Sequence, residues 1–90
     1  MVYDVVTALE GAEVLRRAVW FFAERVPMQA AFPEKQGPGF LTLRGQGGEE
    51  IAMAVAPVPG GTRVRASTLL FDQVVDRFLS TLPAPREQPA

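Results

Sequence analysis

The side chains that could do acid, base or nucleophilic chemistry are few, and they are scattered along the chain: Tyr3, Lys35, Glu49, Glu50, Ser67, Asp72 and Asp76. Neither histidine nor cysteine occurs, so the most common general base and the reactive thiol are missing. Asp72 and Asp76 lie one turn apart near a predicted helix start, where they complement the helix dipole without any reaction. Glu49 and Glu50 are adjacent, so in an extended strand they point to opposite sides and cannot share a proton.

The carboxylates also lack the regular spacing of a calcium-binding loop. We therefore predict that the protein is not an enzyme and has no cofactor and no metal site.

The charge balance argues against two classes of partner. The 90 residues include 9 basic and 10 acidic side chains, a net charge of −1, so no overall field favours nucleic acid or an anionic membrane. No apolar run is long enough to span a bilayer, and no signal peptide is recognisable at the start. We expect a soluble cytoplasmic protein without disulfides. The abundance of arginine, alanine, proline and glycine suggests a GC-rich bacterial source.

The first third of the chain predicts a strand followed by a helix. Residues 2–7 are mostly β-branched or aromatic, and either Val2 and Val6 or Tyr3 and Val5 could face the core. Thr7 and Glu10 have the spacing of a capping box, which predicts that a helix begins there and continues to Pro27. Its predicted apolar stripe is Ala8, Ala12, Leu15, Val19, Phe22 and Val26.

The rest of the chain predicts four strands and a second helix. A short strand over residues 28–32 precedes a connection at 33–39, and three alternating segments separated by glycine-rich turns follow, before a helix over 71–82. Placing Leu43 opposite Ile51 and Val55 opposite Val64 fixes the pairing. The inner face is then Leu41, Leu43, Ile51, Met53, Val55, Val64 and Ala66. The outer face is Phe40, Thr42, Arg44, Ala52, Ala54, Ala56, Arg63, Arg65 and Ser67.

The predicted fold class is α+β, with the order β-α-β4-α and two helices on one face of an antiparallel sheet. Residues 1–82 form one domain, and residues 83–90, rich in proline and polar side chains, form a disordered tail. This order resembles the TATA-binding-protein-like folds, which include the START-type helix-grip proteins and the C-terminal domain of phosphohexomutases. The segment 60–65, Gly-Gly-Thr-Arg-Val-Arg, is similar to the same position in START-type sequences. Residues 65–68 lack the glycine and the Glu-Pro of the phosphohexomutase phosphate loop, so phosphate binding is not transferred.

Two functions of different classes are consistent with this architecture. The first is a small interaction module that forms a homodimer, because a small domain without disulfides gains stability from a partner. Trp20 falls on the polar face of the first predicted helix, where an aromatic side chain suggests a contact. The predicted interface residues are Arg17, Trp20, Phe21, Phe40, Ala54 and Arg65.

The alternative is a reduced START-type carrier, a function that the resemblance implies. It would hold a small apolar ligand between the last helix and the inner face of the sheet. The residues predicted to line its pocket are Leu43, Met53, Val64, Val75 and Phe78.

Overall fold

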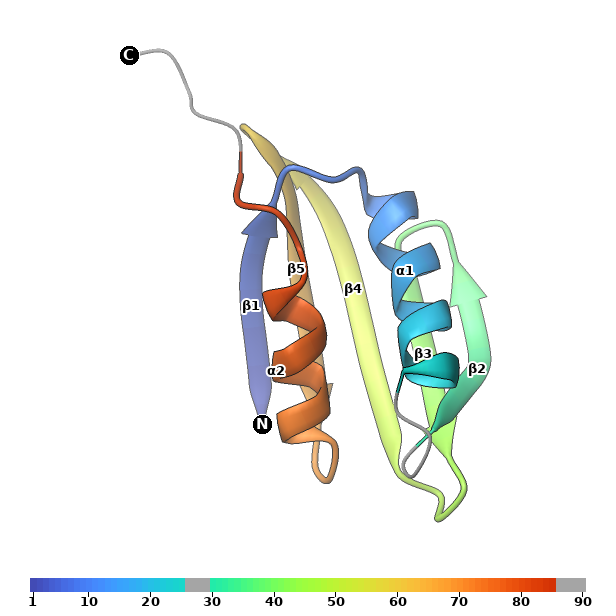
Figure 1. Ribbon diagram of the computed structural model, residues 1–90. Coiled ribbons are helices and arrows are strands. Elements are labelled where there is room, and N and C mark those ends of the chain that lie inside the picture. Colours follow the sequence, from blue (N-terminus) through green and yellow to red (C-terminus); the bar gives the residue numbers. More distant parts are fainter. Residues whose placement is uncertain (26–29, 86–90) are drawn as a thin grey trace.

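The protein is a five-stranded antiparallel sheet with both helices on the same face (Figure 1). The computed structural model describes residues 1–25 and 30–85. In chain order the elements are β1 (Val2–Thr7), α1 (Gly11–Glu24), β2 (Ala31–Gly37), β3 (Phe40–Gly45), β4 (Glu50–Val58), β5 (Gly61–Thr68) and α2 (Asp72–Ser80). The strand order in the sheet is β1-β5-β4-β3-β2, so β4 is the central strand. The predicted α+β class and the order β-α-β4-α are confirmed.

The pairing of the three central strands is the one that the alternating pattern predicts. Leu43 lies opposite Ile51, and Val55 lies opposite Val64. The two tight turns that join these strands each contain a glycine with positive φ, Gly48 at 90° and Gly60 at 85°, a conformation that other residues rarely adopt. Glycine at these two positions therefore helps to hold the register between the strands.

The first strand, β1, forms one edge of the sheet and lies next to the last strand, β5. β1 pairs with β5, and Val5 lies opposite Val64. This pairing turns Tyr3 and Val5 toward the helices and Val2 and Val6 toward the open face, which decides between the two alternatives that the sequence leaves. The helices and the inner face of the sheet enclose the core, whose largest fully buried side chains are Val14, Phe22, Leu41, Leu43, Ile51, Val64, Val75 and Phe78.

β2 differs from the prediction, because the strand continues through the segment that the sequence predicted to be a connection. Ala31–Gly37 pairs with β3, and the register shifts between Pro33 and Lys35. A proline is tolerated here because β2 is an edge strand, so the missing N–H can lie on the unpaired side. Ala31 rather than Phe32 faces the core. Met28, which the prediction placed in this strand, lies outside the described residues.

α1 differs from the prediction at its start and in its buried face. Glu10, not Thr7, is the N-cap residue, and no side-chain capping bond forms. The Thr7 hydroxyl donates instead to the carbonyl oxygen of Pro83, at 2.7 Å. The buried residues of α1 are Val14, Ala18, Phe21 and Phe22, whereas Leu15 and Val19 of the predicted stripe are only half-buried and Ala12 is exposed.

The two helices divide the inner face of the sheet between them. α1 contacts β2, β3 and β4, while α2 lies over the β1 and β5 side (Figure 1). α2 buries Val74, Val75, Phe78 and Leu79, as its apolar spacing predicts. In the two described ranges neither helix is long and apolar enough to cross a membrane. Both helices pack on the same face of the sheet, so neither of them covers the opposite face.

Candidate interaction surface

The open face of the sheet, called the outer face below, has a flat centre. Ala52, Ala54 and Ala56 alternate along the central strand and point away from the helices. Ala54 lies between Phe40 on β3 and Arg65 on β5, so these three residues form one row across the sheet. A shallow groove of about 480 Å³ runs over this centre. Small side chains here allow another molecule to come close to the backbone of the sheet.

A cluster of ion pairs borders the groove on the β1 and β5 side. The Arg63 guanidinium donates from Nε to Asp4 Oδ1 at 3.0 Å, and Arg65 Nε lies 3.6 Å from Asp4 Oδ2. The hydrogen bond from Arg63 lowers the pKa of Asp4 below its ordinary value. Asp4 therefore stays ionised and fixes the two arginines that flank the alanines.

A second ion cluster lies across the sheet, at the start of β4. Arg44 on β3 donates from Nη2 to Glu34 Oε1 at 2.8 Å and to Glu50 Oε2 at 3.0 Å. The hydrogen bond from Arg44 lowers the pKa of Glu34. Of these charged side chains, Arg65 lies beside Ala54 and lines the central groove, whereas Glu34 and Asp4 lie on the edge strands β2 and β1.

Large apolar side chains also lie exposed on this face. Val2, Val6, Phe32 and Phe40 all point outward, and Phe32 and Phe40 are 50% and 44% exposed. The Phe40 ring lies over Gly37 on the edge strand, where a Cβ atom would collide with it. Antiparallel sheets that face water usually alternate apolar inside and polar outside, and this face departs from that pattern.

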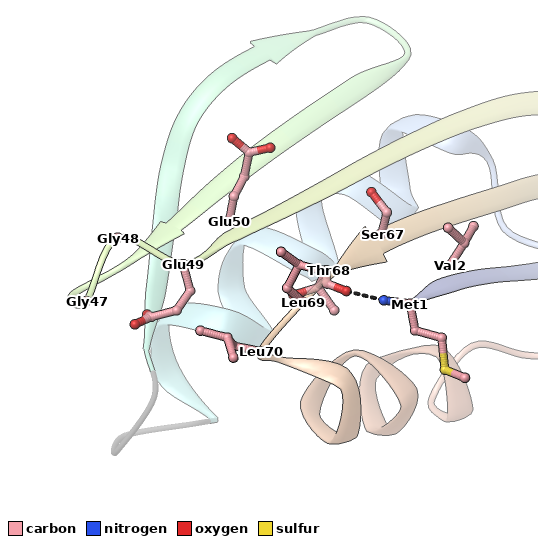
Figure 2. Close-up of a pocket in the computed structure, with 10 residues that line it drawn as sticks. All are labelled: Met1, Val2, Gly47, Gly48, Glu49, Glu50, Ser67, Thr68, Leu69 and Leu70. Atoms are coloured by element: carbon pink, nitrogen blue, oxygen red, sulfur yellow. Dashed lines mark hydrogen bonds between the residues drawn. The ribbon is translucent and has the colours of Figure 1, made fainter.

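One end of the outer face opens into a pocket of about 540 Å³ (Figure 2). Glu50, Ser67 and Val2 extend from three neighbouring strands on its upper side in the figure. The amino group of Met1 donates to the Thr68 carbonyl oxygen at the start of β1. The loop after β5 adds Leu69 and Leu70.

Leu69 and Leu70 are the most unusual residues of this pocket, at 87% and 70% exposed. Leu69 and Leu70 are not among the surface residues predicted from the sequence. The sequence does contain a pattern that indicates their exposure, because two adjacent leucines fit neither the alternation of β5 nor the helical spacing of α2. Neighbouring exposed leucines of this kind are typical of a contact surface.

The predicted interface residues fall into separate places. Phe40, Ala54 and Arg65 come together on the outer face. Trp20, 54% exposed on α1, lies in a different groove between α1 and the β2–β3 edge, and Phe40 lines that groove as well. The Arg25 guanidinium lies 5.6 Å from the centre of the Trp20 ring. Arg17 is exposed and donates from Nε to Glu13 Oε2 at 2.8 Å.

The prediction that Phe21 lies on the surface beside Trp20 is wrong, because Phe21 is buried. Phe21 is only 7% exposed. Its ring centre lies 5.3 Å from that of Phe22 and 5.4 Å from that of Phe78, within the range of favourable aromatic pairs. Adjacent residues of a helix point about 100° apart, so both phenylalanines can be buried when the centre of the buried face lies between their two directions. A spacing of alternately four and three residues assigns only one of them to the core.

The residues predicted to line a carrier pocket are all in the core. Leu43, Met53, Val64, Val75 and Phe78 belong to one buried apolar cluster, to which both helices and the sheet contribute. Membership of the core is what the structure shows for these residues, and their role as the lining of a ligand pocket stays a prediction.

The side chains considered for chemistry are mostly far apart. Tyr3 donates a hydrogen bond to Asp72 Oδ1 at 3.1 Å. The pKa of Tyr3 is raised mainly by desolvation and, to a smaller extent, by this hydrogen bond. Ser67 and Lys35 lie on the outer face, on strands β5 and β2. Among residues 1–25 and 30–85, no three acidic side chains come together as metal ligands would.

Comparisons with known proteins give a partial resemblance. The chain is 34% identical over 73 residues to the bifunctional protein FolD of Acinetobacter baumannii, which is 81% of this chain and 26% of that protein. The FolD of Psychrobacter arcticus is 36% identical over 73 residues, and FolD 2 of Acinetobacter baylyi is 32% identical. The chain thus spans about a quarter of the length of the curated relatives that it matches. No family model and no solved structure matches, so the resemblance to the TATA-binding-protein-like folds stays a prediction.

Proposed function

We propose that this protein is a small association module that works as a homodimer, and that its outer sheet face is the surface that pairs. One observation carries the proposal: both helices cover the same side of the sheet, and the other side presents small and apolar residues. A sheet buries its second apolar face most simply against another sheet, at a spacing of about 10 Å.

A solvated outer face would account for Arg63, Arg65 and Arg44, but not for the aromatic side chains. Phe32 and Phe40 expose large rings beside a flat row of alanines, and burial of such rings is a main source of binding free energy. The ion clusters at the margins then correspond to the polar rim that surrounds the apolar centre of a typical interface.

Sedimentation velocity on the wild type and on two matched variants tests this proposal. We expect a wild-type dimer at micromolar concentration. Ala54→Asp puts a charge at the centre of the outer face and should give a folded monomer, because in the free chain the new carboxylate lies beside Arg65. Gln73→Asp, on the exposed side of α2, is the control and should remain dimeric.

Circular dichroism separates loss of association from loss of folding. A wild type that stays monomeric at high micromolar concentration would exclude the proposal, and so would an Ala54→Asp variant that dimerises as well as the wild type. Met53→Asp provides the comparison for folding, because Met53 lies in the core and its replacement by a charge should unfold the domain.

The apolar carrier remains the alternative proposal. Its support is that Met53, Val75 and Phe78 belong to the same buried apolar cluster. A monomer that binds one equivalent of an apolar dye, and loses that binding on Val75→Phe, which fills space in the core without adding a charge, would favour the carrier over the association module.

A further inference from the structure

We propose that the two copies of the dimer are related by a two-fold axis that runs nearly parallel to β4. This inference rests on the proposed function, because it specifies how the outer faces meet. In this arrangement Phe40 of each copy covers the Arg65–Asp4 pair of the other, and Phe32 of each copy enters the pocket shown in Figure 2.

The strand order supports this direction of the axis. β4 is the central strand, with β5 and β1 on one side and β3 and β2 on the other. Rotation by 180° about a line along β4 lays β3 over β5 of the second copy and β2 over β1, so all five strands are covered. Packed sheets are rotated by about 30°, which inclines the axis by about half of that angle from β4.

The row across the middle of the sheet then becomes complementary to itself. Phe40, Ala54 and Arg65 are in line. The rotation leaves Ala54 facing Ala54 and brings each Phe40 ring over the guanidinium of Arg65 in the other copy. An arginine over an aromatic ring is favourable, and more so when the pair is shielded from water. The interface gains this contact twice.

The other simple axis, which runs across the strands, lacks this complementarity. When this axis passes through Ala54, it lays β5 over β5, so that Arg65 of one copy faces Arg65 of the other and neither lies over a Phe40 ring. Like charges brought together in this way oppose association. The axis along β4 brings Glu50 of each copy opposite Glu50 of the other, and Arg44 of the same copy pairs with each of these carboxylates at 3.0 Å.

The pocket at the end of the outer face has a suitable occupant in the same arrangement. Phe32 lies in the row of Arg44 and Glu50, on the strand β2. Exchange of β2 for β1 carries the Phe32 ring to the start of β1 in the other copy, where Met1 and Leu69 line the pocket. The half-exposed ring and the exposed leucine would then cover each other.

The area available is sufficient for a dimer. Five strands spaced about 4.8 Å apart, each with about six residues at 3.4 Å, give a flat area of roughly 500 Å² on each copy. The total of about 1,000 Å² reaches the lower limit for a specific interface, and the protruding aromatic rings add to it.

Single cysteines can test the axis, because the chain has none of its own. Ala52 and Ala56 lie on the outer face of β4, four residues apart. An axis along β4 places Ala52 opposite Ala52 and Ala56 opposite Ala56, whereas an axis across the strands through Ala54 places Ala52 opposite Ala56. A bis-maleimide with a spacer of about 8–10 Å bridges packed sheets, which lie about 10 Å apart.

We expect Ala52→Cys and Ala56→Cys each to form cross-linked dimers when treated alone. We also expect a mixture of Phe32→Cys with Leu69→Cys to cross-link, and neither of these two variants to cross-link alone. Gln73→Cys on α2 is the control for random collisions and should give no product. Circular dichroism confirms that each variant is folded.

Cross-linking of Ala52→Cys only with Ala56→Cys, or of neither variant in any combination, would overturn the axis. A dimer found by sedimentation velocity together with either result would reject this inference and leave the association module standing. A wild type that is monomeric by the same measurement would reject both.

Discussion

Phe21 links the two helices of the molecule through its ring. Its neighbours are Phe22 on the same helix and Phe78 on α2, and the Arg77 guanidinium lies 6.0 Å from its ring centre. We predict that Phe21→Ala lowers the free energy of unfolding by about 3–5 kcal/mol, the usual cost of truncating a buried phenylalanine. Urea denaturation measures the loss. A loss below about 1 kcal/mol would contradict the burial of Phe21 and indicate that its side chain lies on the surface.

Trp20 is the opposite case, an aromatic residue on the exposed side of the same helix. Its ring contacts the Arg25 guanidinium and contributes nothing to the aromatic cluster of Phe21. We predict that Trp20→Glu leaves both folding and association intact, because the dimer that we propose uses the outer face of the sheet. Sedimentation velocity beside circular dichroism checks this. Loss of the dimer in a folded Trp20→Glu variant would show that the interface includes α1.

At the scale of the elements, β1 is attached to β5 by an ion cluster as well as by the ladder. The bonds from Arg63 lower the pKa of Asp4, whose ordinary value is 3.8, so the unfolded chain binds a proton at higher pH than the folded one. This contribution to stability is fully present above about pH 5 and is lost as the pH falls through the folded pKa of Asp4.

We predict that Asp4→Asn lowers stability at neutral pH and flattens the decline in stability between about pH 5 and pH 2. Urea denaturation at several pH values measures both effects. Part of the decline should remain, because the pKa of Glu34 is also lowered by Arg44. An unchanged slope in Asp4→Asn would show that the Arg63 pair contributes nothing to stability.

The elements also show which patterns in the sequence are informative. The three strands β3, β4 and β5 are joined by short turns, so alternation and glycine positions predict their pairing correctly. β2 was predicted too short because Pro33 and Gly37 are typical of loops, and only its position at the sheet edge makes them acceptable. Thr7 was read as a cap because its true partner, Pro83, is distant in sequence.

The candidate site was only partly predictable for the same reason. Register brings Phe40, Ala54 and Arg65 into one row, and register follows from local alternation. The pocket at the end of the sheet needs Met1 beside Leu69, a contact that exists only because β1 joins β5. No periodic pattern in the sequence specifies that neighbour.

At the scale of the whole molecule, the segment after α2 is tied back to the start of the chain. The Pro83 carbonyl oxygen accepts the hydrogen bond from the buried Thr7 hydroxyl, at 2.7 Å. We predict that deletion of residues 84–90 changes stability by less than about 0.5 kcal/mol. Deletion of residues 83–90 should cost about 1–3 kcal/mol, because the buried hydroxyl loses its acceptor.

Thermal denaturation of the two truncated forms beside the wild type compares these effects. Thr7→Val provides the matched background, since without the hydroxyl the deletion of residues 83–90 leaves no buried donor unpaired and should cost much less than it does in the wild type. Equal stability of the two truncated forms would show that the hydrogen bond between Thr7 and Pro83 does not contribute to the stability of the domain. A large loss from the shorter deletion would show that the segment after Pro83 packs on the domain.

The pairing of β1 with β5 also sets the order in which the chain can fold. Val5 and Val64 are partners, so during synthesis β1 must wait for its place in the sheet until β5 has emerged from the ribosome. The hairpins from β2 to β5 need only short loop closures and can form before it, whereas distant pairing is slow because loop entropy is lost first. During synthesis, an edge of β5 therefore stays open until β1 arrives, and this edge is where a nascent chain would be most prone to pair with a neighbouring one.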